Sequence, residues 1–497
     1  MGERVARRFR GRLGWAVCLA AGLALLIVAP IPGLAGAHAP HKAYADAKIH
    51  VMSQTYSDCI ILESNGLFGM VDAGEDLDYP DGSDSRYPLR SGINTEDGYD
   101  EQVFAYLDEL GVNHDNFVFF MGTHPHSDHI GLANEVIERY QPQRVYLGKY
   151  SDSMIGYEPA LWDNQYVYDQ AVEAANLVGA ELIQQVSDTV IAKHSAHFTL
   201  GDMQLTIENH DHDFSVHKAL DANDMSWGLL VEAYGQRAFL SGDINNYLGD
   251  EDRLAQTLGH VDYLKLGHHA NDGSNTDGYL DALTPTYAIQ TGQFELFSTR
   301  TLYKLNDLGT HIYTAQEALG RGYQATVATL GEGGISFNTH DDDVVYRHHD
   351  TGTYMYCYQD GLPVVAPRGW VEWSGYYFWF DGQSTSAAVS QWVQDEGNWY
   401  YVDEYSCRAT GWRVVDHKWY YFSDDGVMQH DTWVDNSYLR SDGTLEINPL
   451  SVGPLHSKAR PGLGMVSEYV RTGTLQPAVP HEGPGRESHR GHNRGGR

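Results

Sequence analysis

Histidine and aspartate gather at the end of one apolar run. His124, His126, Asp128 and His129 follow the strand-like stretch Asn116–Met121. Two histidines one residue apart at a strand end can face one metal ion, and the aspartate and histidine that follow can turn toward a second. Imidazole and carboxylate groups suit zinc or a similar divalent ion. The pattern therefore predicts a metal centre, and the alternative is a surface histidine cluster that binds no metal.

Two further sets of ligand-type residues stand after apolar runs. Asp243 follows residues 238–240, and His268 and His269 follow residues 263–266. Strand ends are rigid and exposed, so layered α/β folds often build their sites there. Agreement among three strand ends favours the metal centre over a surface cluster. Adjacent residues on a strand face opposite ways, so we expect one of His268 and His269 to bind metal, or both if the strand end turns.

The expected chemistry is hydrolysis by a pair of metal ions. Two ions that share a bridging water lower its pKa and hold the oxygens of a phosphoryl or carbonyl group. Asp243 is the best candidate to bridge the ions, because one carboxylate can offer an oxygen to each. We predict catalytic roles for Asp128, Asp243 and His269. No serine or cysteine nucleophile is needed.

Other polar segments allow two interpretations each. The stretch 210–212 with His217 could add a metal ligand, although its turn-like composition favours a solvated loop. Asp72 ends an early strand and could support the metal ligands from behind. A Ca²⁺ site is conceivable in the acidic segment that follows, and a solvated loop is the alternative. That segment contains Asp76, Asp78, Asp81 and Asp84.

The elements that must position these residues alternate in type along the first part of the chain. Short apolar runs such as Lys48–Met52 and Cys59–Leu62 predict strands. The helical spacing after Asp100 predicts a helix that ends near Gly111. We expect an α/β domain built as an αββα sandwich over residues 46–345, followed by a linker at 346–368.

An aromatic pattern repeats through residues 369–450 at roughly twenty-residue spacing. Each unit has a tryptophan, an aromatic cluster and often Asp-Gly, which signals a β-hairpin. Units this short must stack to bury a core. Their rings could also cage a quaternary ammonium group through cation–π attraction, and the alternative is that they only stack. The candidate cage residues are Trp392, Trp399, Tyr401, Trp412, Trp419 and Tyr421.

Both ends of the chain differ in composition from its middle. Arginines precede an apolar run at 15–29, which predicts a signal peptide at 1–45 and a secreted, cell-wall-associated protein. An uncleaved membrane anchor is the alternative. Residues 451–497 are rich in Gly, Pro, Arg and His, and we expect a disordered tail there. The 4 Cys form no disulfide framework.

The formal net charge of the chain is −34 at pH 7. A nucleic acid normally needs a basic surface, so we expect no nucleic-acid partner. Solubility outside the cell is the simpler account of this charge.

The metal motif resembles the pattern of the metallo-β-lactamase superfamily: His-x-His-x-Asp-His, then Ser-Gly-Asp, then a strand ending in Gly-His-His. Residues 48–345 are most similar to one branch, the teichoic acid phosphorylcholine esterases, which are choline-binding cell-wall proteins. The metal motif is shared by many hydrolases, and other stretches are more specific. They include Val71–Asp76, Asp81–Pro88, Ser127–Gly131, Leu161–Asn164 and Gly242–Asn246. The chain departs from the branch at Ala270 and Asn271, where the branch has a longer histidine run.

This resemblance implies a dizinc enzyme that releases phosphorylcholine from wall teichoic or lipoteichoic acid in the bacterial cell wall. It implies that small phosphocholine esters are substrates, and an aromatic ring near the site would then receive the trimethylammonium group: Trp162, Tyr166 or Trp227, unless these rings are core. The metal ligands that it implies are His124, His126, Asp128, His129, Asp243 and His268 or His269. The third histidine that classical β-lactamases place on the first metal has no clear counterpart.

Two other functions are kept as alternatives. The first is a general phosphodiesterase or nuclease of the superfamily branch linked to DNA uptake, which shares the Gly-His-His strand end. The second is a surface adhesin whose hydrolase domain is catalytically weak.

Overall fold

The structure is a computed structural model, which describes residues 47–95, 98–339, 344–349 and 354–446. The predicted signal peptide at 1–45 and the predicted tail at 451–497 lie outside the described residues. No helix of the described part is long and apolar enough to cross a membrane.

The first β-sheet combines strands from the beginning and end of the predicted α/β domain. Its strands lie in the order β15-β14-β1-β2-β3-β4-β5-β6, and β3 to β6 run parallel. Because β1 pairs with β14, residues near 50 and near 327 lie side by side in one sheet. The strands are β1 (Ala47–Met52), β2 (Cys59–Ser64), β3 (Leu67–Ala73), β4 (Phe117–Gly122), β5 (Arg144–Leu147), β6 (Glu181–Ile183), β14 (Ala325–Gly331) and β15 (Gly334–Phe337).

The second sheet has the order β13-β12-β11-β10-β9-β8-β7. Strands β10 to β13 run parallel, so their carboxyl ends meet at one edge. The strands are β7 (His197–Leu200), β8 (Met203–Glu208), β9 (Gly228–Ala233), β10 (Gln236–Leu240), β11 (Tyr263–Lys265), β12 (Tyr287–Gln290) and β13 (His311–Thr314).

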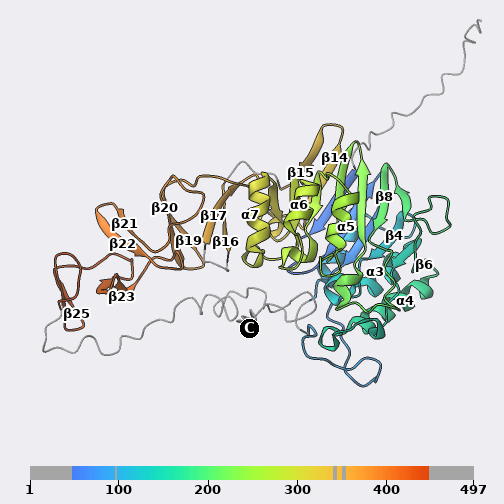
Figure 1. Cartoon of the computed structure of the whole chain (residues 1–497), viewed down its shortest axis with the longest axis horizontal. Helices are drawn as coiled ribbons and strands as arrows, with labels where there is room; N and C mark the ends of the chain where they lie inside the picture. The colour runs from blue at the N-terminus through green and yellow to red at the C-terminus, as the bar shows by residue number, and fades with distance from the viewer. Residues whose placement is uncertain (1–46, 96–97, 340–343, 350–353, 447–497) are drawn as a thin grey trace, which may run out of the picture. The chain divides into compact units, whose positions relative to one another are not determined.

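An apolar core from both sheets separates them, and helices cover their outer faces. Helices α1 (Asp100–Leu110), α3 (Ala133–Tyr140) and α4 (Asn164–Val178) pack on the first sheet. Helices α5 (Asp250–Thr257), α6 (Asp277–Leu283) and α7 (Thr299–Leu308) pack on the second and lie side by side (Figure 1). Short helices α2 (Ser127–Ile130) and α8 (Glu317–Gly320) lie at loop positions, as do the 3₁₀ turns η1 (Asp152–Met154), η2 (Glu158–Ala160), η3 (Ala222–Met225), η4 (Gly267–Ala270) and η5 (Phe294–Leu296). The mixed α/β class is confirmed.

The segment expected as a linker is instead a three-stranded sheet. It contains β16 (Val345–His349), β17 (Tyr354–Gln359) and β18 (Leu362–Pro363). Arg347 Nε donates to Glu317 Oε1 at 2.6 Å, and the Tyr358 ring joins the core under α6 and α7. Such side chains pack this stretch onto the α/β layers, which its mixed composition did not reveal.

Four hairpins follow, and each forms a separate two-stranded sheet. Their tight turns place Asp416, His417, Asp435 and Asn436 in the left-handed region, where short polar residues are tolerated. The hairpins stack through small aromatic cores, as expected for repeats. Their strands are β19 (Gly369–Trp373), β20 (Tyr376–Phe380), β21 (Gln391–Asp395), β22 (Asn398–Val402), β23 (Gly411–Val415), β24 (Lys418–Phe422), β25 (Thr432–Val434) and β26 (Ser437–Leu439).

Candidate metal centre

Three strand ends deliver the predicted ligands to one place. His124 and His126 follow β4, and α2 then carries Asp128 and His129. Asp243 follows β10, and His268 and His269 follow β11. All of these side chains are buried. Strands β10 and β11 are parallel neighbours, so their carboxyl ends lie at one edge of the second sheet, and the end of β4 in the first sheet meets them there.

The ligand atoms form two neighbouring groups. His124, His126 and Asp243 make one group, with ligand atoms within 4.8 Å of one another, and Asp128, His129 and His269 make the other. Asp243 Oδ1 lies 3.2 Å from His129 Nε2, while its Oδ2 lies 4.0 Å from His124 Nε2. One carboxylate is therefore within reach of both groups, as a bridging ligand requires.

Both His268 and His269 face this centre. His269 Nε2 lies 3.3 Å from Asp128 Oδ2, and His268 Nε2 lies 3.9 Å from Asp243 Oδ2. The strand alternation does not apply, because His268, His269 and Ala270 all have left-handed backbones, with φ of 51°, 51° and 66°. Such conformations cost about 1–3 kcal/mol each in non-glycine residues and cluster at functional sites.

The donor set fits divalent cations. Buried polar atoms in proteins are normally hydrogen-bonded, and an unsatisfied one costs about 1–3 kcal/mol. Several buried ligand atoms here have no hydrogen-bond partner among the described residues. They are His126 Nε2, His129 Nε2, His269 Nε2 and both carboxylate oxygens of Asp128 and of Asp243. Imidazole nitrogen with carboxylate oxygen is the donor set of zinc.

Burial keeps the first histidine pair in the form that binds metal. Burial lowers the pKa of His124 well below its usual value and lowers that of His126 to about 4. Both rings are therefore neutral at pH 7, and neutral imidazole is the metal ligand.

Asp72 supports the centre from behind, as predicted. Its Oδ2 lies 2.8 Å from His129 Nδ1 and accepts a 2.7 Å hydrogen bond from Thr123 Oγ1. The Thr123 backbone N–H donates to the other carboxylate oxygen at 2.7 Å. This contact leaves His129 Nε2 to face Asp243, the arrangement by which outer carboxylates orient metal-binding imidazoles.

Asp58 and Lys265 belong to the same buried cluster, and our sequence interpretation missed both. Lys265 Nζ contacts Asp58, donates to Gly242 O at 2.8 Å and lies 3.6 Å from Asp243 Oδ1. Asp58 Oδ1 lies 3.5 Å from His269 Nδ1, and Asp58 forms a third possible ligand group with His129 and Asp243. A lysine inside the apolar strand β11 was the available signal, because a buried charge needs a partner.

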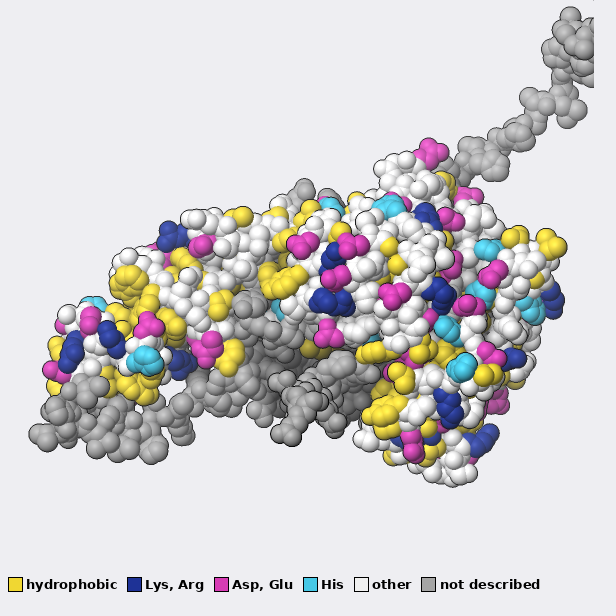
Figure 2. Space-filling view, in the orientation of Figure 1, with side chains coloured by type: hydrophobic (Ala, Val, Ile, Leu, Met, Phe, Trp, Pro, Cys, Tyr) yellow, Lys and Arg dark blue, Asp and Glu magenta, His cyan; other side chains and the backbone are white. Residues whose placement is uncertain are grey.

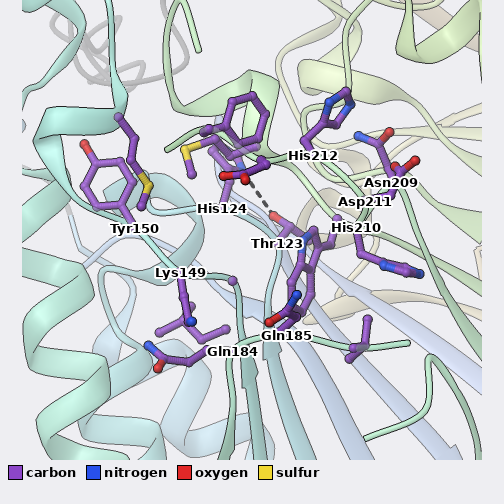
Figure 3. Close-up of a pocket in the computed structure, with 18 of the residues that line it drawn as sticks. Thr123, His124, Lys149, Tyr150, Gln184, Gln185, Asn209, His210, Asp211 and His212 are labelled. Atoms are coloured by element: carbon purple, nitrogen blue, oxygen red, sulfur yellow. Dashed lines mark hydrogen bonds between the residues drawn. The ribbon is translucent and has the colours of Figure 1, made fainter. Parts of the chain in front are cut away.

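A cavity of about 930 Å³ adjoins the centre at His124 (Figure 3). Lys149, Gln184, Gln185 and His210 line it. The volume is that of a typical ligand pocket.

The two tryptophans predicted to bind substrate differ in place. Trp162 is half-buried, and its ring meets that of His126 edge-on, with centroids 5.2 Å apart. Trp227 is only 7% exposed and packs in the core between the sheets, although it also lines the cavity. Trp162 is thus the better candidate for a ligand contact.

The histidine stretch at 210–212 and the acidic segment at 76–84 contribute no residue to the possible metal-binding groups of the described residues. His210 Nε2 pairs with Asp188, and His212 Nε2 with Asp250. In the acidic segment, Asp78 accepts from Tyr166, Asp81 accepts from the Ser83 backbone and Asp84 pairs with Arg86. Calcium binding there stays a prediction.

The six candidate cage residues divide into core and surface. Trp412 is 7% exposed, and Trp392 packs against Tyr420 with ring centroids 4.8 Å apart. Trp399 and Trp419 are 42% and 39% exposed. Tyr401 and Tyr421 are half-buried beside Trp392 and Trp412. Figure 2 shows hydrophobic side chains gathered over this hairpin region, so stacking and ligand contact can coexist in the same module.

Comparison with known proteins recognises this module. Residues 409–441 match the family model of the choline-binding repeat, and residues 390–404 match that of a putative cell wall binding repeat. No curated protein matches the chain.

Solved structures also align with the chain. The choline binding domain of Spr1274 from Streptococcus pneumoniae is 27% identical, and the alignment covers 17% of this chain and 100% of that one, with a TM-score of 0.16. CbpJ from Streptococcus pneumoniae is 22% identical, and the alignment covers 26% of this chain and 41% of that one, with a TM-score of 0.18. These TM-scores are low, so the assignment rests on the repeat motifs: the hairpins within residues 390–441 are choline-binding and cell-wall-binding repeats, which indicate association with a cell wall.

Proposed function

We propose that this protein is a dimetal phosphodiesterase of the metallo-β-lactamase superfamily that releases phosphorylcholine from a choline-bearing cell-wall polymer. The observation that carries the proposal is the pair of buried ligand groups with Asp243 within reach of both: Asp243 belongs to the first group, and its Oδ1 lies 3.2 Å from His129 Nε2 of the second. The layered arrangement of two sheets and two helix layers supports the superfamily assignment.

His124, His126 and Asp243 would hold one ion, and Asp128, His129 and His269 the other. The pair of ions would supply an activated water and stabilise charge on a phosphoryl group. His268 lies next to Asp243 and would complete the first group in place of the missing third histidine.

The surrounding residues keep these ligands in place. Asp72 and Thr123 orient the His129 ring, and Thr291 Oγ1 lies 3.1 Å from His269 Nδ1. Lys265 offsets part of the charge of Asp58 and Asp243. These groups are buried and already oriented, so the site needs little reorganisation when substrate binds.

Two features support a phosphorylcholine ester over other diesters. The half-buried Trp162 ring stands beside His126, where it could receive a trimethylammonium group. The choline-binding repeats would hold the enzyme on polymers that carry the same headgroup. The chain's net charge of −34 weighs against a nuclease.

The test compares kcat/KM for p-nitrophenyl-phosphorylcholine and bis-p-nitrophenyl phosphate, with correction for the leaving group. We expect the phosphorylcholine ester to be preferred by about threefold to thirtyfold, the value of one well-placed ring. A chelator should remove both activities, and zinc should restore them. Equal rates on the two esters would favour the general phosphodiesterase, and no metal-dependent activity would favour the adhesin.

A further inference from the structure

We infer that Arg90 is a positioning residue for substrate selectivity: it holds Trp162 beside the metal centre and so sets the preference for a cationic headgroup. This inference rests on the proposed function, since it assigns a role within the same site. Arg90 precedes all of the metal ligands in the chain, and its guanidinium bonds Trp162 and Asp152, which are not ligands.

Trp162 has a backbone that must be held in place. It lies between η2 and the start of α4, and its φ is +30°. A tryptophan is strained at positive φ, and such strain persists only when the surroundings impose it. Without that constraint the residue would relax toward an ordinary conformation, and its ring would move relative to His126.

The Arg90 guanidinium supplies the constraint. Its Nη1 donates to the backbone carbonyl of Trp162 at 2.6 Å, and its Nη2 donates to Asp152 Oδ2 at 2.8 Å. Both charged side chains are about three-quarters buried, with exposed fractions of 25% and 22%, so this pair is shielded from solvent.

Asp152 is itself anchored on the opposite side. Its Oδ1 accepts from Tyr150 OH at 2.9 Å, and its backbone N–H donates to Gln165 Oε1 at 3.1 Å. Arg90 therefore ties the Trp162 carbonyl to a fixed point in the 150–152 segment. The planar two-point contact requires a guanidinium, which lysine cannot reproduce.

The placement of the ring separates headgroup recognition from phosphoryl chemistry. The Trp162 ring meets the ring of His126 edge-on, while Asp72 contacts His129 and Lys265 lies 3.6 Å from Asp243. Loss of Arg90 should therefore weaken binding of a trimethylammonium group and leave the metal ligands in place.

The experiment uses the full zinc-loaded chain and the variants R90Q, R90K and R86Q. Arg86 is the matched control, because it lies in the same loop but is 69% exposed and pairs with Asp84. For R90Q we expect KM for p-nitrophenyl-phosphorylcholine to rise about threefold to thirtyfold, with kcat and bis-p-nitrophenyl phosphate hydrolysis within about twofold of wild type. The KM of R90K should lie between those of wild type and R90Q, and the KM of R86Q should match that of wild type.

A second readout isolates the cationic group. Choline should inhibit bis-p-nitrophenyl phosphate hydrolysis by the wild type, and its neutral isostere 3,3-dimethylbutan-1-ol should inhibit less. R90Q should weaken inhibition by choline and leave that by the alcohol unchanged. In a double-mutant cycle, R90Q should add little to the loss already caused by Trp162→Leu.

The outcomes separate the two proposals. A wild-type enzyme with no preference for the phosphorylcholine ester overturns the proposed function and this inference together. A wild-type preference that survives in R90Q overturns only the role of Arg90, as does an equal loss on both esters. If R90Q fails to fold, shown by its circular dichroism, the selectivity of R90K decides.

Discussion

Asp243 is fully buried beside both groups of ligand atoms: its Oδ1 lies 3.2 Å from His129 Nε2, and its Oδ2 lies 4.0 Å from His124 Nε2 and 3.6 Å from His269 Nε2. One water molecule or one proton could pair with one of these oxygens. It would leave the neighbouring imidazole nitrogens and carboxylate oxygens without a hydrogen-bond partner. Substitution of Asp243 is therefore the most direct test of the metal centre.

Asp243→Ala should lower the metal content from about two ions per chain and reduce turnover by more than about a hundredfold. The expected loss exceeds the 10- to 100-fold effect of residues that only support metal ligands. Elemental analysis and the rate on p-nitrophenyl-phosphorylcholine measure the two effects. Asp188→Asn is the control, because Asp188 pairs with His210 at the cavity and lies outside the ligand groups. A D243A protein with full metal content and rate would limit Asp243 to a structural role.

At the scale of elements, the loop after β3 contains an unusual carboxyl group. Asp76 is buried, and both its oxygens lack a hydrogen-bond partner among the described residues. Burial, with the nearby charges of Asp78, Asp100 and Asp163, raises the pKa of Asp76 to about 8. This loop continues to Arg90, so the stability of the loop affects the predicted contact between Trp162 and substrate.

The raised pKa of Asp76 predicts how stability depends on pH. The folded pKa of about 8 is above the ordinary value of 3.8, so the folded state holds the proton more tightly. Its contribution is fully present below about pH 4 and is lost as pH rises through about 8. The slope is at most about 1.4 kcal/mol per pH unit.

Asp76→Asn removes this titration and should flatten the fall of Tm between pH 5 and 8. Thermal unfolding of both proteins across that range, at constant zinc, gives the comparison. Asp81→Asn is the control, since Asp81 is an exposed carboxylate of the same loop. Parallel curves for wild type and D76N would show that Asp76 ionises normally in the folded protein.

At the scale of the whole molecule, catalysis and wall attachment are assigned to different sets of residues. All predicted metal ligands precede residue 270, while the choline-binding repeat matches lie at 390–404 and 409–441. The β16–β17–β18 sheet between them is bonded to the α/β layers through Arg347 and His349. A cut in this region would damage the fold, so point substitutions test the division better than truncation.

The double variant W399A/W419A should lose retention on a choline resin and keep the rate on a soluble phosphorylcholine ester within about twofold. These rings are the exposed members of the predicted cage, and each cation–π contact is worth about 0.5–2 kcal/mol. Tyr157→Ala is the control, because Tyr157 is 59% exposed on the α/β domain. Undiminished retention would mean that the aromatics only stack the hairpins.

The sequence by itself determined the features that depend on neighbouring residues. The ligands follow apolar strands within a few positions, so local patterns placed His124, His126, Asp128, His129 and Asp243 at strand ends. The hairpin repeats were equally predictable, because each one closes through its own turn.

Only the tertiary structure decided which distant residues share the centre. Asp58 and Lys265 are far apart in the chain but meet because β2 and β11 lie in facing sheets. His268 and His269 both face inward because of the left-handed turn after β11. The segment at 346–368 forms a sheet because Arg347 and Tyr358 have partners in the α/β layers. These contacts join segments that are distant in the sequence. Their stabilising energy therefore depends on tertiary packing, and a local sequence pattern does not predict it.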